Sequence, residues 1–301
     1  MNLESGFILV HKPKDITSSS AVLKTKKLIH KKKIGHTGTL DKFAEGLLIL
    51  PFGFCTSFSS LFLEMEKTYT SEIKFGMATD SGDIDGVIVE EWDARRTSEF
   101  FQRNLEKITE KIKEIQTTTS QVPPKVSALK IKGVRQAELF RRGIEFESTS
   151  RNIFIRDFSF ANLSDEGFLM SLTVSSGTYI RKLILDLYEN TGLPMHITRL
   201  IRTKIGGTEL ADSSTIEAME NGEFSVKQLE EILEIPSIQI GRKEELSVSH
   251  GGYIRLPGNL ESRYGFLLKN EDKKIIAWCS MSGKKEHLPY KYNKVFADST
   301  F

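Results

Sequence analysis

Apolar residues recur at regular intervals along this 301-residue chain and predict strands mixed with helices. Residues 69–77 and 168–174 alternate between apolar and polar side chains, which is typical of half-buried strands. Over residues 101–115 and 180–187, apolar side chains return every third or fourth position, which predicts amphipathic helices. No segment repeats another, so the pattern indicates an ordinary globular protein.

The amino-terminal part predicts a strand, a helix and a glycine-rich loop. Residues 6–10 form an apolar run that indicates a short buried strand. Thr17 or Ser18 then offers a side-chain oxygen that can cap a helix. Residues 35–46 contain three glycines and no stable period, so we expect a loop there.

Two further segments are predicted to lie outside regular structure. Residues 79–86 are rich in glycine and aspartate, which favours a solvated turn. Residues 121–143 combine Pro123 and Pro124 with many basic residues and weak periodicity. We expect a long surface excursion or a small helical insertion there.

The carboxyl-terminal part predicts a separate small domain. Residues 226–233 are helix-like and lead to Pro236, so we place a domain boundary near residue 236. Beyond it, residues 248–256 and 264–276 are expected to supply strands of a small barrel.

Composition excludes several classes of protein. Hydrophobic residues make up 39% of the chain, which is enough for a buried core. The first apolar run, Phe7 to Val10, is too short for a signal peptide or a membrane span. Cys55 and Cys279 show no paired spacing, so neither a disulfide framework nor a metal site is predicted. We therefore expect a cytoplasmic protein without a membrane segment.

The net charge of +2 does not by itself indicate a nucleic-acid-binding protein. Basic residues are nevertheless concentrated in residues 24–33, where six lysines and one histidine fall within ten positions. Such a cluster suits phosphate contacts, although a solvated helix face explains it equally well.

Three short segments carry residues suited to chemistry. Residues 35–41 read Gly-His-Thr-Gly-Thr-Leu-Asp, and glycines beside a His and an Asp allow the backbone to approach a ligand closely. Tyr69 lies on the apolar face of a predicted strand. Arg181 begins a predicted helix, where its charge opposes the helix dipole. We therefore expect Arg181 to have a specific anionic partner, a carboxylate or a phosphate.

Taken in order, these segments resemble the TruB family of bacterial tRNA pseudouridine-55 synthases. The resemblance covers nearly the whole chain and rests on several motifs in the right order and spacing. These are Lys12-Pro13 with Thr17-Ser18, Gly35 to Asp41, Lys67-Thr68-Tyr69 with Phe75-Gly76 and Thr79-Asp80, Gln121 to Pro124 with Ser127-Ala128-Lys130 and Gly133, Gly177 to Arg181, and Leu200-Ile201-Arg202 through Gly206.

The resemblance implies a role for each matching residue. Asp41 matches the family's catalytic carboxylate, which begins cleavage of the glycosidic bond by acting on either the base or the sugar. Tyr69 matches a tyrosine that stacks on the target base, and Arg181 matches an arginine that pairs with the catalytic carboxylate. The resemblance also implies contacts with the substrate from His36, Tyr179, Leu200, Arg202 and Lys12.

The family resemblance further implies a fold, a substrate and a set of partners. The expected fold is α+β, with a mixed, mainly antiparallel sheet and flanking helices over residues 1–236. An RNA-gripping insertion is expected at about residues 117–147, and a small β-rich PUA-like domain at residues 237–301. The expected substrate is uridine 55 in the T-arm of tRNA. We expect a monomer that uses no cofactor, no metal and no guide RNA.

Several positions depart from the family pattern. Asp15 stands where a glycine is usual, and Lys42 and Glu45 replace a proline and a threonine near Asp41. Ser57 stands where a lysine is common. None of these changes removes a catalytic group, so they bear on loop rigidity and RNA affinity.

Three other functions compete with this prediction. A catalytically idle tRNA-binding or tRNA-folding protein could use the same fold. The guide-RNA-dependent branch of the family is a second alternative, and the insertion at 121–143 argues against it. A carboxylate-dependent hydrolase would need a second acid near Asp41, and Glu45 is the local candidate.

Overall fold

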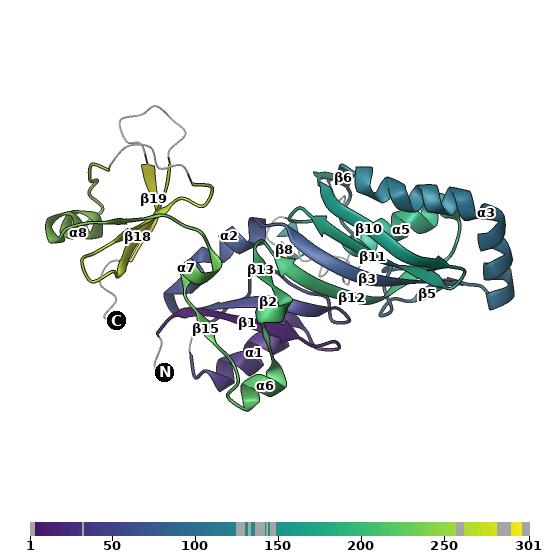
Figure 1. Cartoon of the computed structure of the whole chain (residues 1–301), viewed down its shortest axis with the longest axis horizontal. Helices are drawn as coiled ribbons and strands as arrows, with labels where there is room; N and C mark the ends of the chain where they lie inside the picture. The colour runs from purple at the N-terminus through teal and green to yellow at the C-terminus, as the bar shows by residue number, and fades with distance from the viewer. Residues whose placement is uncertain are drawn as a thin grey trace.

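A nine-stranded mixed sheet forms the centre of the molecule (Figure 1). The computed structural model describes residues 4–31, 33–124, 130–131, 134–135, 142, 144, 149–256, 262–281 and 290–296, and every structural statement below concerns these residues. The strands of the central sheet are β1 Gly6–Lys12, β2 Glu45–Phe52, β3 Lys67–Phe75, β10 Ile155–Ser164, β11 Gly167–Val174, β12 Met195–Ile205, β13 Thr208–Glu209, β14 Ser214–Thr215 and β15 Val226–Lys227.

The order of the strands is β10-β11-β3-β12-β2-β1-β14, with β13 paired to β12 and β15 paired to β1. The β12–β2 and β1–β14 pairs are parallel, and the other pairs are antiparallel. This mainly antiparallel sheet with flanking helices confirms the predicted α+β class. The alternation predicted for residues 69–77 is also confirmed, although Gly76, at a φ of 91°, separates β3 from the following strand.

Helices flank the sheet, and side-chain oxygens cap two of them. Thr17 accepts a hydrogen bond from Ser20 N at the start of α1, as its position predicted, and Asp93 accepts one from Arg96 N at the start of α3. The helices are α1 Ser18–Leu28, α2 Ser59–Glu64, α3 Ala94–Glu114, α5 Ile180–Thr191, α6 Ile216–Glu220, α7 Leu229–Ile232 and α8 Arg242–Ser249, with 3₁₀ turns η1 Gly53–Phe58, η2 Ile115–Thr117 and η3 Leu210–Asp212.

Apolar side chains fill both faces of β1 and β2 but one face of β3. Phe7 and Leu9 pack with η1 and α2, whereas Ile8 and Val10 pack with α1 and α6. Burial on both faces explains why these strands read as continuous apolar runs. On β3, alternate residues pack against α3 and α5 and leave the other face of the sheet open.

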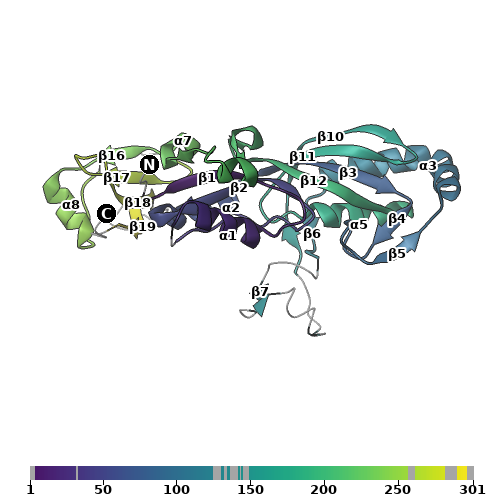
Figure 2. The same cartoon turned by 90° about the horizontal axis from the view of Figure 1, so that it is seen from below.

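A second sheet lies at the opposite end of the molecule from α3 (Figures 1 and 2). Its strands, in order, are β16 Ser237–Gln239, β17 Phe266–Lys269, β18 Ile275–Met281 and β19 Tyr290–Val295. The strands expected within residues 264–276 are present. The strand expected at 248–256 is wrong, because Val248 belongs to α8 and residues 250–256 form turns and irregular backbone.

One further segment differs from the prediction, and the predicted insertion lies mostly outside the residues that the structure describes. The helix expected at 226–233 begins only at Leu229, because Val226 and Lys227 pair with the edge of β1 instead. Most of the insertion expected at 117–147 lies outside the described residues. At its base, β6 Ser120–Gln121 pairs with β9 Arg151–Asn152. Within the insertion, β7 Lys130–Ile131 pairs with β8 Val134–Arg135.

An aromatic cluster joins the second sheet to the rest of the molecule. Phe58 of η1 is fully buried, and its ring centroid lies 5.1 Å from that of Trp278 in β18 and 5.9 Å from that of Phe296. Because these contacts join segments more than 200 residues apart, the position of the second sheet depends on them.

We expect Phe58→Ala to lower the free energy of unfolding by about 3–5 kcal/mol, because it leaves a cavity at this junction. Urea denaturation followed by circular dichroism measures the change. Leu246→Ala on α8, at a side chain that is 57% exposed, is the matched control and should change it by less than about 0.5 kcal/mol. Equal effects of the two substitutions would contradict a packed junction.

Candidate active site

The loop that carries Asp41 is fixed at both ends by hydrogen bonds. At its start, Thr37 N and Thr37 Oγ1 both donate to Ile49 O of β2, at 3.1 and 3.3 Å. At its end, Leu40 N donates to Ser18 Oγ at 2.8 Å, and Ser18 Oγ donates to Leu40 O at 3.1 Å. Asp41 follows directly, with a side chain that is 45% exposed. The carboxylate is therefore presented to solvent from a backbone that is held in place.

Arg202 of β12 holds the middle of the same loop. Its side chain is 1% exposed, and its guanidinium donates to Gly38 O at 3.1 Å and to Leu47 O at 2.8 Å. Gly46 has a φ of 114°, and a Cβ there would lie 2.4 Å from Arg202 O. The close approach of β2 to β12 therefore requires glycine at this position.

Lys12 holds the far side of the loop. The ammonium donates to the carbonyl oxygens of Pro13, Ile16 and Lys42, at 2.9, 2.7 and 3.4 Å. Burial lowers the pKa of Lys12 to about 8, and the nearby Asp41 carboxylate opposes part of that shift.

Asp15 N also donates to Lys42 O, and Asp15 has a φ of 68°. This left-handed backbone explains why the family pattern has glycine at position 15.

The charged centre of the site consists of one arginine and two aspartates. Arg181, in the first turn of α5, is 7% exposed. Its Nε donates to Asp41 Oδ2 at 2.9 Å and lies 3.4 Å from Asp83 Oδ2. Its Nη1 lies 3.4 Å from Ser81 O. The anionic partner expected for Arg181 is thus a carboxylate, contributed by two residues.

Asp83 is a member of the charged centre that the sequence did not reveal. The composition of segment 79–86 predicts a solvated turn, but Asp83 is 4% exposed. Burial raises the pKa of the Asp83 carboxyl, and the Arg181 guanidinium opposes that shift. Ser81 Oγ and Asp85 N each donate to Asp83 Oδ1 at 2.9 Å, which orients the carboxylate. Because Asp83 stands among glycines and aspartates typical of a turn, its sequence context did not indicate that its carboxylate is buried.

Gln121 fixes the entry to α5. Its Nε2 donates to Tyr179 O at 3.0 Å, and its Oε1 accepts from Tyr179 N at 2.8 Å. Tyr179 lies two residues before Arg181, so the start of the insertion helps to place the arginine. Tyr179 is partly buried, as is His36, whose Nδ1 accepts a hydrogen bond from Gly38 N at 3.3 Å.

The remaining predicted residues lie on the face of the sheet that the helices cover. Tyr69 of β3 is partly buried and packs against the core, and Leu200 of β12 is 4% exposed. The register pairs Tyr69 with Arg202 and Ser71 with Leu200. Because directly opposite residues share a face, Tyr69 and Leu200 lie on the same side, under the loop that Arg202 holds.

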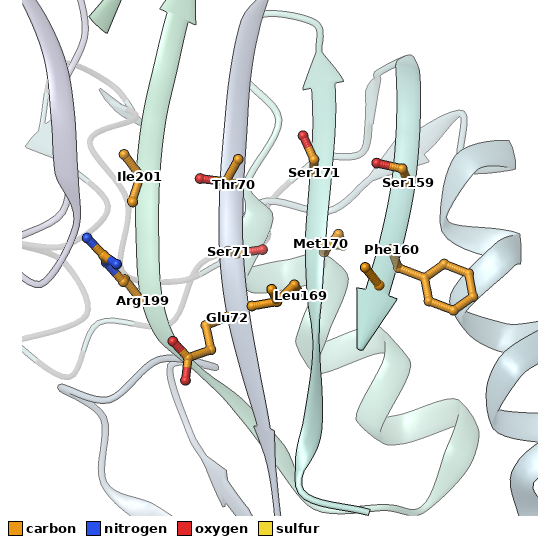
Figure 3. Close-up of a pocket in the computed structure, with 11 residues that line it drawn as sticks. Thr70, Ser71, Glu72, Ser159, Phe160, Leu169, Met170, Ser171, Arg199 and Ile201 are labelled. Atoms are coloured by element: carbon orange, nitrogen blue, oxygen red, sulfur yellow. The ribbon is translucent and has the colours of Figure 1, made fainter. Parts of the chain in front are cut away.

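A cavity of about 280 Å³ lies over the open face of the same sheet (Figure 3). None of the residues predicted from the sequence lines it, and most of its lining residues alternate with Tyr69 and Leu200 along the strands, so they lie on the opposite face of the sheet. Its lining residues are Thr70, Ser71, Glu72, Ser159, Phe160, Ala161, Leu169, Met170, Ser171, Arg199 and Ile201.

Within the described part of the chain, no three His, Cys, Asp or Glu side chains are grouped so that they could hold a metal ion. Likewise, none of the helices that the structure describes has the length and apolar character needed to cross a membrane.

We expect Gly46→Ala to lower the free energy of unfolding by about 1–3 kcal/mol, since both the positive φ and the Arg202 backbone oppose a Cβ. Thermal unfolding measures this. Gly35→Ala, in the loop before β2 and with no atom within 4 Å of the place that a Cβ would take, is the control and should change stability by less than about 0.5 kcal/mol. If Gly46→Ala proved as mild as the control, the close contact between β2 and β12 would be refuted.

Comparison with known sequences reveals extensive similarity. A family model described as the N-terminal domain of TruB family pseudouridylate synthases matches residues 26–180. A tRNA pseudouridine synthase B of Leptospira interrogans is 40% identical over 300 residues, which cover 97% of this chain and 94% of that protein. A tRNA pseudouridine synthase B of Azoarcus sp. is 35% identical over 258 residues, 84% of each chain.

Solved structures share the fold. A Cbf5-Nop10-Gar1 complex aligns with a TM-score of 0.67 at 21% identity, over 97% of this chain and 85% of that chain. An archaeal box H/ACA sRNP Nop10-Cbf5 complex aligns with a TM-score of 0.65 at 19% identity, over 97% and 86%. The pseudouridine synthase fold predicted from the resemblance is therefore confirmed, and the four-stranded second sheet fits its PUA-like part. The chain belongs to the TruB family of pseudouridylate synthases.

Proposed function

We propose that this protein converts uridine to pseudouridine at position 55, in the T-arm of tRNA. The relatives named tRNA pseudouridine synthase B support tRNA as the substrate. One observation carries the proposal: a half-exposed Asp41 carboxylate, on a loop fixed at both ends, bonded to the buried Arg181. That arrangement suits a carboxylate that attacks an incoming ligand.

The reaction assigns a task to each group. A stacked uridine must leave its loop and enter the site, at a cost of roughly a few kcal/mol. Tyr69 then stacks on the base, and Asp41 begins cleavage of the bond between the base and the sugar. The Arg181 guanidinium favours the charged form of the carboxylate that this step requires. The base turns and rejoins the sugar through C5, which then loses its proton, while N1, released from the sugar, takes a proton up. The reaction is therefore an isomerisation that donates no group and needs no cofactor.

The other predicted residues contribute in two ways. His36 lies on the loop that carries Asp41, Tyr179 lies two residues before Arg181, and Leu200 belongs to the same buried cluster as Leu40. We assign these three residues contacts with the flipped nucleotide and the space that it leaves. Lys12 and Arg202 direct their side-chain nitrogens to backbone carbonyls on either side of Asp41. These two residues support substrate binding by fixing the loop.

The same proposal divides the chain by task. Residues 1–236 form the catalytic domain, with an RNA-gripping insertion at about 117–147, and residues 237–301 form an RNA-binding domain. The start of β16 at Ser237 supports this boundary. We further propose that the protein acts as a monomer in the cytoplasm, without a guide RNA.

The competing functions have less support. A hydrolase would use Glu45 as its second acid, but Glu45 Oε1 accepts a hydrogen bond from Arg199 Nε at 2.6 Å. His11 Nε2 lies 3.9 Å from the other Glu45 oxygen. An idle binding protein would not need the Arg181 contact to Asp41.

We expect Asp41→Asn to abolish pseudouridine formation, because it keeps the side-chain shape and removes the charge that attacks. Chemical mapping of pseudouridine in tRNA after incubation with each protein measures this, and a filter-binding assay checks that RNA affinity is retained. Glu45→Gln is the control and should keep activity within about threefold, whereas the hydrolase alternative requires it to be inactive. An active Asp41→Asn variant would refute the assignment.

We expect Asp83→Asn to lower kcat by about 10- to 100-fold, because an amide nitrogen or oxygen replaces the charged acceptor beside Arg181. Single-turnover kinetics with saturating enzyme separate this loss from weaker RNA binding. Asp85→Asn, at an exposed carboxylate two residues away, should leave the rate unchanged. Equal rates for the two variants would show that Asp41 alone positions Arg181.

A further inference from the structure

Ser71 carries a buried hydroxyl whose bonding capacity is unused. The residue is 5% exposed, and its Oγ finds no hydrogen-bond partner among the described residues. A buried polar atom in this state costs free energy, so native proteins rarely retain one without a reason. A ligand that enters the protein during function would provide such a reason.

The position of Ser71 indicates which ligand that is. Side chains alternate along β3, so Ser71 shares a face with Tyr69, two residues before it. The register places Ser71 directly opposite Leu200 in β12 and opposite Met170 in β11. Opposite Cβ atoms in an antiparallel pair lie about 5 Å apart, so the hydroxyl is a neighbour of both residues assigned to the base, Tyr69 and Leu200.

The catalytic loop covers the same face. Leu40, the residue before Asp41, belongs to the buried cluster that contains Leu200 and against which Tyr69 packs. Arg202, which shares a face with Leu200, reaches up to Gly38 O in this loop. Ser71 therefore lies on the strand that carries Tyr69, directly opposite Leu200, on the face of the sheet that also packs against Leu40 of the catalytic loop.

We propose that the Ser71 hydroxyl donates a hydrogen bond to a carbonyl oxygen of the flipped uracil ring and so helps to select this base. The proposal rests on the proposed function, since it needs a uracil against Tyr69. Uracil carries carbonyl oxygens at C2 and C4, and one of the two accepts the hydrogen bond from the Ser71 hydroxyl. No covalent step is assigned to Ser71, which acts as a base-binding residue.

A second buried hydroxyl provides a matched control. Thr25 Oγ1 of α1 also finds no partner among the described residues, and Thr25 is fully buried. Its helix packs on β1 and β2, not on the face that carries Tyr69 and Leu200. Removal of either hydroxyl eliminates an unpaired polar atom, but only Ser71 lies at the proposed base site.

The first experiment compares Ser71→Ala with Thr25→Val in the full-length protein. Neither variant should unfold at a lower temperature, because each loses an unpaired hydroxyl. On unmodified T-arm RNA, Ser71→Ala should lower kcat/KM by about 5- to 20-fold, and Thr25→Val should stay within about twofold of the unaltered protein. Ser71→Ala with unaltered kcat/KM would overturn the proposal.

The second experiment changes the base and needs no variant to fold. T-arm RNA is made with 2-thiouridine or 4-thiouridine at the target position, because sulfur is a poor hydrogen-bond acceptor. The unaltered protein should discriminate against one of the two, and Ser71→Ala should lose that discrimination. Equal treatment of uridine and both analogues by the unaltered protein would overturn the proposal. An unaltered protein that modifies no RNA would instead overturn the proposed function, and this inference with it.

Discussion

The contact of Arg181 with Asp41 and Asp83 determines the geometry of the whole site. Three segments meet there: the loop before β2, the turn at 79–86 and the first turn of α5. A buried guanidinium is stable only when anions or acceptors surround it, and the buried Asp83 needs a cation for the same reason. The two groups therefore stabilise each other in the interior, and the same Arg181 Nε donates a hydrogen bond to the more exposed Asp41. The reactive carboxylate of Asp41 is thus oriented by the more deeply buried ion pair of Arg181 and Asp83.

Buried cations fix the backbone around this centre without using carboxylates. Lys12 donates to carbonyls on either side of the catalytic loop, and Arg202 donates to Gly38 O and Leu47 O. Lys67 donates to the carbonyls of Phe62, Leu63 and Met65, which end α2. Burial lowers the pKa of both lysines to about 8, so each is still mostly charged at pH 7. The strands and the loop are thereby joined through side chains as well as through the sheet.

The sequence predicts the regular elements and the central pair of the site, but not the contacts that depend on distant backbone. Strict alternation identified β3, and the unfavourable position of Arg181 at a helix start correctly indicated a carboxylate or phosphate partner. Asp83 could not be identified, because its burial follows from bonds to a strand more than 100 residues away: Ile84 N donates to Ile197 O, and Ile197 N to Gly82 O. For the same reason Val226 and Lys227 read as a helix, since only the exposed edge of β1 makes them a strand.

The central sheet consists of two halves that meet at a narrow seam. The parallel pairing of β12 with β2 involves two residue pairs, Ile201 with Glu45 and Arg202 with Gly46. One half carries Tyr69 and Leu200, and the other carries the strand into which the Asp41 loop leads. Any change in the angle between the halves therefore alters the spacing between the reactive carboxylate and the stacking ring.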